Sequence, residues 1–227
     1  MFSVLEILII LLVALVSYLI GGINASIIVT KLLDSGNDIR DVGSGNAGFT
    51  NVLRTKGKKL AIFTFAIDFI KGVVALGCTH FLVTYFCGVT ANSAVFLFAE
   101  YMACLCCVLG HVYPCFWGFR GGKAILVTWS AMLLIDWRVF LWLIAVFLIV
   151  LLTKKIVSLA SVCAAVSYPF SVFFSTYFFE YRFSQNILDV IIPVIFSVLI
   201  SVLICYKHKG NIKRLLSGTE KAITIHK

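Results

Sequence analysis

The chain has little charge and almost no proline. Only 13% of its 227 residues are charged and 3 are Pro, whereas soluble domains carry about 25% charged residues. Hydrophobic residues make up 61% of the chain, and its mean hydropathy is +1.06. Folding in water would expose large apolar patches, and the sequence has no low-complexity tract typical of disorder. The composition therefore predicts a polytopic membrane protein.

Several common catalytic and binding signatures are also missing. The chain has no Gly-x-Ser-x-Gly elbow and no His followed five positions later by Asp, which excludes two familiar hydrolase and acyltransferase arrangements. No basic face alternates with stacking aromatics, so we expect no nucleic-acid partner. The eight cysteines lie mostly in apolar runs and are predicted to pack as small hydrophobes without disulfides.

The apolar runs predict an all-α bundle of seven transmembrane helices in a single domain, residues 1–227. A bilayer core about 30 Å thick needs about 20 apolar helical residues. The candidate spans are roughly 4–30, 60–84, 92–111, 124–136, 139–153, 156–179 and 187–206. The fourth and fifth are short and are separated by the polar turn 136–138.

The positive charges predict the orientation of these spans. With seven spans, segments 31–59, 112–123, 154–155 and 207–227 share one side and hold 16 of the 19 Lys and Arg residues. Because cytoplasmic loops are enriched in Lys and Arg, we expect the N-terminus outside and the C-terminus in the cytoplasm. No Lys or Arg precedes Lys31, which favours a signal-anchor helix over a cleaved signal peptide.

The polar residues gather in four stretches on the predicted inner side. In the first stretch, Gly43, Gly45 and Gly48 allow tight turns. The guanidinium of an arginine and several neutral hydrogen-bond donors lie close by in the sequence. Those polar residues are Ser44, Asn46, Thr50, Asn51 and Arg54. The stretch predicts a phosphate-binding loop; the alternative is a plain polar loop with a helix cap.

The second stretch ends in Gly121-Gly122-Lys123 at a predicted helix start. Free amides, a helix terminus and an ammonium can converge there on an anion. The spacing is not that of a Walker A loop. The alternative is that a Lys at an inner helix end follows from topology alone.

The third and fourth stretches carry hydroxyl, imidazole and amide groups. Ser158 and Ser161 lie at the inner mouth of a span, where such residues also serve helix packing. His208 and Asn211 are three apart, so a helix places both on one face, where a His can position a hydroxyl or accept its proton. The alternative is a basic tail resting on anionic headgroups.

Polar groups inside the predicted spans are expected to serve ion pairing and helix packing. Asp68 and Lys71 are three apart and are predicted to form a structural ion pair; the alternative is that they contact a substrate. Cys104, Cys107 and His111 share a helical face, but a fourth ligand is missing, so we expect helix packing and no metal site.

Taken in order, these stretches resemble the bacterial acyl-phosphate:glycerol-3-phosphate acyltransferase family (PlsY) over nearly the whole chain. The residues that carry the resemblance are Gly43-Ser44-Gly45-Asn46, Thr50-Asn51, Arg54, Asp68-x-x-Lys71-Gly72, Gly110-His111, Pro114, Phe116, Gly121-Gly122-Lys123, Ser158, Ser161, His208-x-x-Asn211-Ile212, Arg214-Leu215, Gly218 and Glu220. Phe49 and Ala124 depart from it, since the family commonly has Ala and Gly at these two positions.

The resemblance implies a multi-pass enzyme of the bacterial cytoplasmic (inner) membrane. It would transfer a fatty acyl group from acyl phosphate to the 1-hydroxyl of sn-glycerol 3-phosphate, releasing lysophosphatidic acid and phosphate. It implies no cofactor and no metal, a monomer in the lipid bilayer, and the enzyme that supplies acyl phosphate as a partner. Acyl phosphate is already activated, so the catalyst mainly brings hydroxyl and carbonyl together.

The resemblance also suggests roles for the candidate residues. Phosphate would be held by Ser44, Asn46, Thr50, Asn51, Arg54, Lys123 and the amides of Gly121 and Gly122. Ser161 and Ser158 would donate hydrogen bonds at the reacting centre, His208 and Asn211 would orient glycerol phosphate, and Glu220 would pin the tail through a Lys or Arg. The proton acceptor, His208 or a substrate phosphate oxygen, is left open.

Two other functions compete with this one. A transporter of an anionic metabolite would want binding groups near the bilayer midplane and repeated halves, and the chain shows neither pattern. A divergent relative that acylates another phosphorylated alcohol, or has lost activity, is suggested by Phe49 and Ala124.

Overall fold

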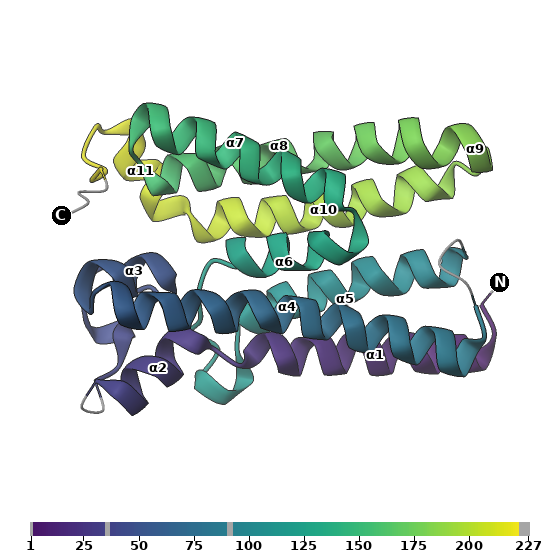
Figure 1. The fold of residues 1–227 in the computed structure, drawn as a ribbon, viewed down its shortest axis with the longest axis horizontal. Coiled ribbons are helices and arrows are strands. Elements are labelled where there is room, and N and C mark those ends of the chain that lie inside the picture. Colours follow the sequence, from purple (N-terminus) through teal and green to yellow (C-terminus); the bar gives the residue numbers. More distant parts are fainter. Residues whose placement is uncertain (1, 35–36, 90–92, 223–227) are drawn as a thin grey trace. The chain divides into compact units, whose positions relative to one another are not determined.

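Helices make up nearly all of the chain's secondary structure. The computed structural model describes residues 2–34, 37–89 and 93–222, and within these ranges it contains helices and connecting turns but no strand. Its contacts divide the chain into two compact units, Met1–Ile135 (unit 1) and Asp136–Lys227 (unit 2). The chain order of the helices can be followed by colour in Figure 1.

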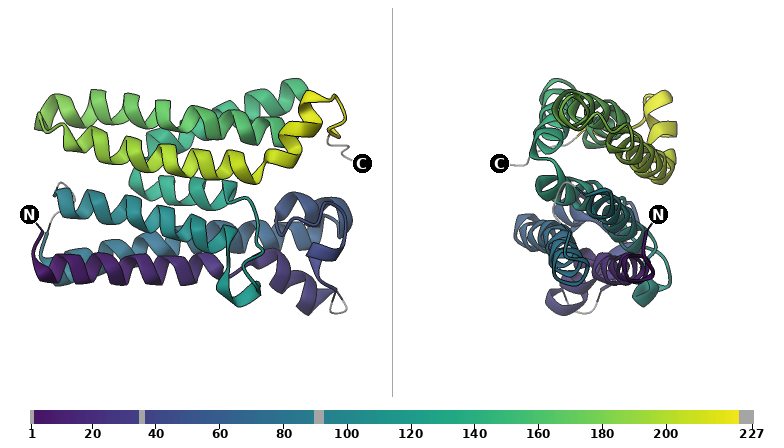
Figure 2. Two further views of the ribbon diagram at one scale, coloured as in Figure 1. Left: turned by 180° about the vertical axis from the view of Figure 1, so that it is seen from behind. Right: turned by 90° about the vertical axis from the view of Figure 1, so that its right-hand side faces the viewer.

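Unit 1 is built on three long helices. Its helical elements are α1 (Val4–Gly22), α2 (Ala25–Leu33), η1 (Ile39–Asp41), α3 (Phe49–Thr55), α4 (Lys58–Cys87), α5 (Ala94–Val112), η2 (Cys115–Trp117) and α6 (Ile125–Ile135). Helices α1, α4 and α5 pack against one another, and α6 packs on α4 and α5 (Figure 1). Helices α2 and α3 lie at the end of unit 1 opposite the N-terminus, as the reverse view in Figure 2 also shows.

Glycines let α1 and α5 touch backbone to backbone. A Cβ atom on Gly21 would collide with the carbonyl oxygen of Cys107, and one on Gly110 would collide with the carbonyl oxygen of Tyr18. Small residues at helix crossings are the usual means of close packing in membranes, where van der Waals contact drives association.

The first predicted span is interrupted. The predicted span over 4–30 corresponds to the apolar segment Val4–Leu33, but it is not one continuous helix, because α1 ends at Gly22 and the chain runs extended through Ile23 and Asn24 before α2 begins. The Asn24 side chain accepts a hydrogen bond from the Ile27 amide at 3.2 Å and so caps α2. An apolar pattern continues across this point, so hydropathy alone did not reveal the cap.

Unit 2 is a bundle of three long helices with short elements at both ends. They are α7 (Trp137–Lys154), α8 (Val157–Thr176), η3 (Tyr177–Tyr181), α9 (Arg182–Ser184), α10 (Leu188–Lys207) and α11 (Lys209–Leu216). Helix α8 packs on both α7 and α10. Asp136 caps α7 and pairs with Arg138 at 2.8 Å, while Arg138 also reaches Glu180 at 3.0 Å. This network ties the start of α7 to the π-helical turn η3.

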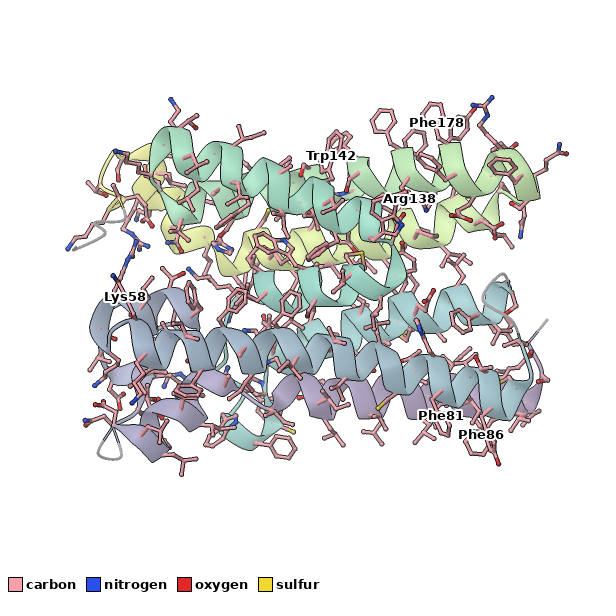
Figure 3. All side chains as sticks on the ribbon, viewed as in Figure 1. Lys58, Phe81, Phe86, Arg138, Trp142 and Phe178 are labelled. Atoms are coloured by element: carbon pink, nitrogen blue, oxygen red, sulfur yellow. The ribbon has the colours of Figure 1, made fainter. Side chains whose placement is uncertain are left out.

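Six helical segments of the described residues are long and apolar enough to cross a bilayer. The predicted fourth span is present as α6, but its 11 residues reach only about 16 Å at 1.5 Å per residue. Figure 3 shows Phe81 and Phe86 pointing outward from unit 1, and Trp142 and Phe178 pointing outward from unit 2. Such exposed apolar side chains suit contact with lipid.

We expect Gly21→Val to destabilise unit 1. Overpacking a close contact typically costs about 1–3 kcal/mol, and the backbone of α5 cannot yield as a side chain would. The measurement is the midpoint of thermal unfolding in detergent. Gly77→Ala is the matched control, since nothing lies within 4 Å of a Cβ atom at this α4 glycine. An equal midpoint for Gly21→Val and wild type would contradict the backbone contact.

Candidate functional site

In unit 1, the first polar stretch folds around the side chain of Asn51. This amide is buried; its Oδ1 accepts from the Ser44 amide at 2.9 Å, and its Nδ2 donates to the carbonyls of Ile39 and Val42 at 3.1 and 3.0 Å. Gly43 (φ +63°) sits so close that a Cβ atom would collide with Asn51 Oδ1. The polar atoms of Asn51 thus close the loop, and its expected contact with phosphate stays a prediction.

The remaining groups of this stretch are accessible. Thr50 and Arg54 are four apart on α3 and therefore share a face; Arg54 is exposed and Thr50 half-buried. Ser44 is exposed on the loop and Asn46 is half-buried. These four residues keep the expected character of a polar surface around one guanidinium. Phe49, the bulky departure, packs its ring on Phe65 of α4 with centroids 5.8 Å apart.

The side chain of Arg40 joins this stretch to the second one. Arg40 contacts Asp38 at 2.7 Å, and its Nη1 donates to the carbonyl of Trp117 at 2.7 Å. The Arg40 hydrogen bonds, aided by Lys31 at 3.4 Å, outweigh partial burial and lower the pKa of Asp38 to about 2. The sequence did not predict this hydrogen bond from Arg40, because the Trp117 carbonyl lies 77 residues further along the chain.

The glycines before Lys123 are used for close packing. The amide of Gly121 donates to the carbonyl of Val112 at 3.2 Å, and that of Gly122 donates to the carbonyl of His111 at 3.1 Å. Both amides thus already have partners within the protein, and their expected binding of phosphate stays a prediction. A Cβ atom on Gly121 would strike the His111 carbonyl, and one on Gly122 would strike His111 Nε2.

The same packing brings the two unit 1 stretches together. A Cβ atom on Gly122 would also lie within 2.5 Å of the Ala47 carbonyl oxygen, just before α3. Lys123, half-buried, follows at once, and Ala124 then adopts φ +61° before α6 begins. The departure at position 124 thus places an alanine where the left-handed backbone favours glycine.

No metal site replaces these contacts. Within residues 2–34, 37–89 and 93–222, no three His, Cys, Asp or Glu side chains are grouped to hold an ion. Cys104 and Cys107 are buried, Cys107 lies against Gly21 of α1, and His111 Nδ1 lies 2.7 Å from the ammonium of Lys71. Lys71 pairs with Asp68 at 2.7 Å, which confirms the expected ion pair.

In unit 2, one carboxylate gathers the third and fourth stretches. Glu220 Oε1 accepts hydrogen bonds from Ser158 Oγ and Asn211 Nδ2, each at 2.7 Å, and its Oε2 accepts from Arg214 Nε at 2.6 Å. Partial burial opposes these three hydrogen bonds, yet together they lower the pKa of Glu220. The expected pairing of Glu220 with a basic residue is confirmed, and its grip on Ser158 and Asn211 was missed.

These contacts describe the hydrogen bonding of two predicted site residues. The hydroxyl hydrogen of Ser158 points to Glu220, and its expected role as a donor at the reacting centre stays a prediction. Ser161, one turn further along α8, is buried. His208 ends α10, and its Nδ1 lies 2.8 Å from the Ile204 carbonyl. Because a carbonyl only accepts, Nδ1 carries the hydrogen, and in the neutral ring Nε2 keeps the lone pair.

The fold and these two polar regions define a multi-pass helical membrane protein with cations placed beside glycine-rich turns. The family profile described as "Glycerol-3-phosphate acyltransferase" matches residues 11–218. The chain belongs to this glycerol-3-phosphate acyltransferase (PlsY) family.

Curated relatives and solved structures agree with the profile. Glycerol-3-phosphate acyltransferases of Clostridioides difficile and Aquifex aeolicus are 38% and 35% identical, with 94% and 90% of this chain and 95% and 94% of each relative covered. The crystal structure of PlsY (YgiH), an integral membrane glycerol 3-phosphate acyltransferase in its glycerol 3-phosphate form, superposes with a TM-score of 0.78 at 33% identity, covering 95% of this chain and 96% of that one. Its lysophosphatidic acid form gives a TM-score of 0.76 at 32% identity and 95% coverage of both chains.

We expect Asn51→Asp to loosen the loop of residues 39–44. The carboxylate cannot donate to the Ile39 and Val42 carbonyls, and leaving buried groups unsatisfied typically costs about 1–3 kcal/mol. Thermal unfolding measures the loss. Asn37→Asp, at an exposed position near this loop, is the control and should change little. Equal midpoints for both variants would contradict the role of Asn51.

We expect Ala124→Gly to stabilise the chain. An L-residue with a left-handed backbone costs roughly 1–2 kcal/mol, part of which returns as extra entropy of the unfolded glycine. The net expectation is a gain of about 0.5–1 kcal/mol, measured by thermal unfolding. Ala131→Gly, inside α6, should lower the midpoint instead. A lower midpoint for Ala124→Gly would count against the strained backbone.

Proposed function

We propose that this chain transfers a fatty acyl group from acyl phosphate to the 1-hydroxyl of sn-glycerol 3-phosphate. The observation that carries this proposal is the packing of Gly122 on Ala47 in unit 1, which joins the segment that carries Lys123 to the one that leads to Arg54. Both substrates carry phosphate, and a guanidinium and an ammonium are suited to phosphate oxygens. Family membership supports the same reaction.

Each polar region has its own part in the proposed reaction. Arg54 and Lys123 bind phosphate groups, with Ser44, Asn46 and Thr50 as neutral partners. His208, held through Nδ1, presents Nε2 toward the glycerol hydroxyl, and Asn211 orients the glycerol phosphate. Ser161 donates a hydrogen bond to the carbonyl oxygen as negative charge develops on it. The two polar regions are held in their conformations by hydrogen bonds of Asn51, Gly121, Gly122 and Ser158.

The chemistry needs no covalent enzyme intermediate. The hydroxyl oxygen bonds to the acyl carbon, the bond from that carbon to the phosphate oxygen breaks, and inorganic phosphate leaves with the bonding electrons. The hydroxyl proton passes to His208 Nε2 or to a substrate phosphate oxygen. Binding both substrates in reactive alignment supplies most of the rate enhancement, since acyl phosphate is already activated.

The setting of the enzyme is part of the proposal. We place it in a bacterial cytoplasmic membrane as a monomeric, single-domain acyltransferase, with α6 and the segment before it as a seventh crossing. The concentration of Lys and Arg in alternate connections supports an outer N-terminus and a cytoplasmic C-terminus. An enzyme that makes acyl phosphate would then supply the donor at the same membrane.

The test uses purified protein in detergent with a synthetic acyl phosphate and glycerol 3-phosphate. We expect wild type to form lysophosphatidic acid and phosphate, detected by mass spectrometry and phosphate assay. Lys123→Ala and His208→Ala should each lose at least about 100-fold in kcat/KM, the range typical of lost electrostatic or acid–base groups. Lys154→Ala, at an exposed helix end, is the control and should keep its rate.

Other outcomes separate the alternatives. Full activity of both the Lys123→Ala and His208→Ala variants would overturn the assignment. Product formed from another phosphorylated alcohol, in a panel that includes glycerol 3-phosphate, would indicate a divergent relative. Uptake of glycerol phosphate into vesicles without turnover would indicate a transporter.

A further inference from the structure

The ammonium of Lys71 lies buried among four polar groups. Its Nζ is 3.1 Å from the Gly21 carbonyl, 3.0 Å from the Ile23 carbonyl, 2.7 Å from Asp68 and 2.7 Å from His111 Nδ1. Only 4% of the Lys71 side chain and 2% of the Asp68 side chain are exposed. A buried charge in a membrane-spanning helix is expensive and is retained where it serves a purpose.

Two of these contacts hold the break after α1. The last carbonyls of a helix have no partner within it, and the chain is extended at Ile23 and Asn24. Lys71 donates to the Gly21 and Ile23 carbonyls on either side of the helix end. Just beyond, Asn24 Nδ2 donates to the Ala47 carbonyl at 3.5 Å. The break is thereby fixed to α4 and to the segment before α3.

The third contact holds the ring of His111. An ammonium has no lone pair, so His111 Nδ1 accepts from Lys71, and the neutral ring carries its hydrogen on Nε2. That Nε2 faces Gly122, where a Cβ atom would collide with it. The His111 carbonyl also accepts the Gly122 amide. Both the ring and the backbone of His111 therefore set the position of the residue before Lys123.

We propose that Lys71 is a positioning residue for the acyl transfer proposed above: from within the bundle it aligns Lys123 with the segment that leads to Arg54, by holding His111 and the break after α1. It does not touch the substrates. The role rests on the proposed function, because Lys123 and Arg54 are its targets. A purely structural ion pair between Asp68 and Lys71 would have no such effect on phosphate binding.

Neutralising both charges separates the two roles. Removing one partner leaves an uncompensated buried charge and endangers folding, whereas replacing both is often tolerated. The double variant Asp68→Asn/Lys71→Met keeps side chains of similar size but removes the ammonium from Gly21, Ile23 and His111. Its control is His80→Gln/Glu100→Gln, a second, partly buried pair on α4 and α5 whose atoms lie 2.6 Å apart. On α4, His80 is nine residues, about 13 Å, from Lys71.

The measurements are kcat and KM in the transfer assay and the stabilisation of the protein by glycerol 3-phosphate in thermal unfolding. We expect Asp68→Asn/Lys71→Met to fold but to lose about 100-fold in kcat/KM, the usual effect of misplacing a binding group by 1 Å. Its stabilisation by glycerol 3-phosphate should disappear. The control variant should keep both, within about threefold of wild type.

Different results would contradict the positioning role of Lys71 and the proposed acyl transfer. Wild-type kcat/KM and glycerol phosphate stabilisation in Asp68→Asn/Lys71→Met would overturn the positioning role and leave the function standing. Absence of transfer by wild type would refute the function, while the stabilisation measurement would still judge the positioning role. If the double variant does not fold, Lys71→Arg keeps the charge but cannot repeat all four contacts; unchanged activity and stabilisation there would equally overturn the role.

Discussion

A charge placed inside a membrane-spanning bundle has to be satisfied by the protein itself, because lipid offers no hydrogen bonds. In unit 1 that requirement falls on Lys71. Its ammonium is met by Asp68, by His111 and by two carbonyls at the end of α1. This one cluster contacts the break in the first span and the ring of His111, which in turn lies against Gly122 just before Lys123.

Unit 2 uses a carboxylate where unit 1 uses an ammonium. Glu220 joins Ser158 of α8, Asn211 of α11 and Arg214, so the end of the helical bundle and the tail become one structure. In both units, some of the polar residues that a sequence motif would single out, among them Asn51, Ser158 and Asn211, bind other protein groups. The groups whose chemistry best suits the proposed substrates are the cations of Arg54 and Lys123 and the imidazole of His208. The other polar contacts hold the chain in place, as a reaction that depends on the alignment of two substrates requires.

Much of the architecture could be predicted because lipid imposes a simple rule on apolar runs. All seven predicted segments contain a helix, and the Asp68–Lys71 pair forms as expected from spacing on one helix. The break at Asn24 was not predictable, since it depends on partners in α4 and before α3. The contacts of Asn51 depend likewise on carbonyls 9 and 12 residues before it, and those of Gly121 and Gly122 on carbonyls of α5; no local pattern encodes these positions. Glu220 was only half predicted: a basic partner follows from nearby charges, but Ser158 lies 62 residues away.

The contact between α1 and α5 has a consequence for how a fatty chain reaches the enzyme. At Gly21 and Gly110 the two helices meet through main-chain atoms, with no side chains between them that could rotate aside. Separating the helices at these two points would forfeit the close main-chain contacts together. For the proposed acyl transfer, this favours entry of a hydrocarbon tail along a boundary lined by movable side chains rather than between α1 and α5 at Gly21 and Gly110.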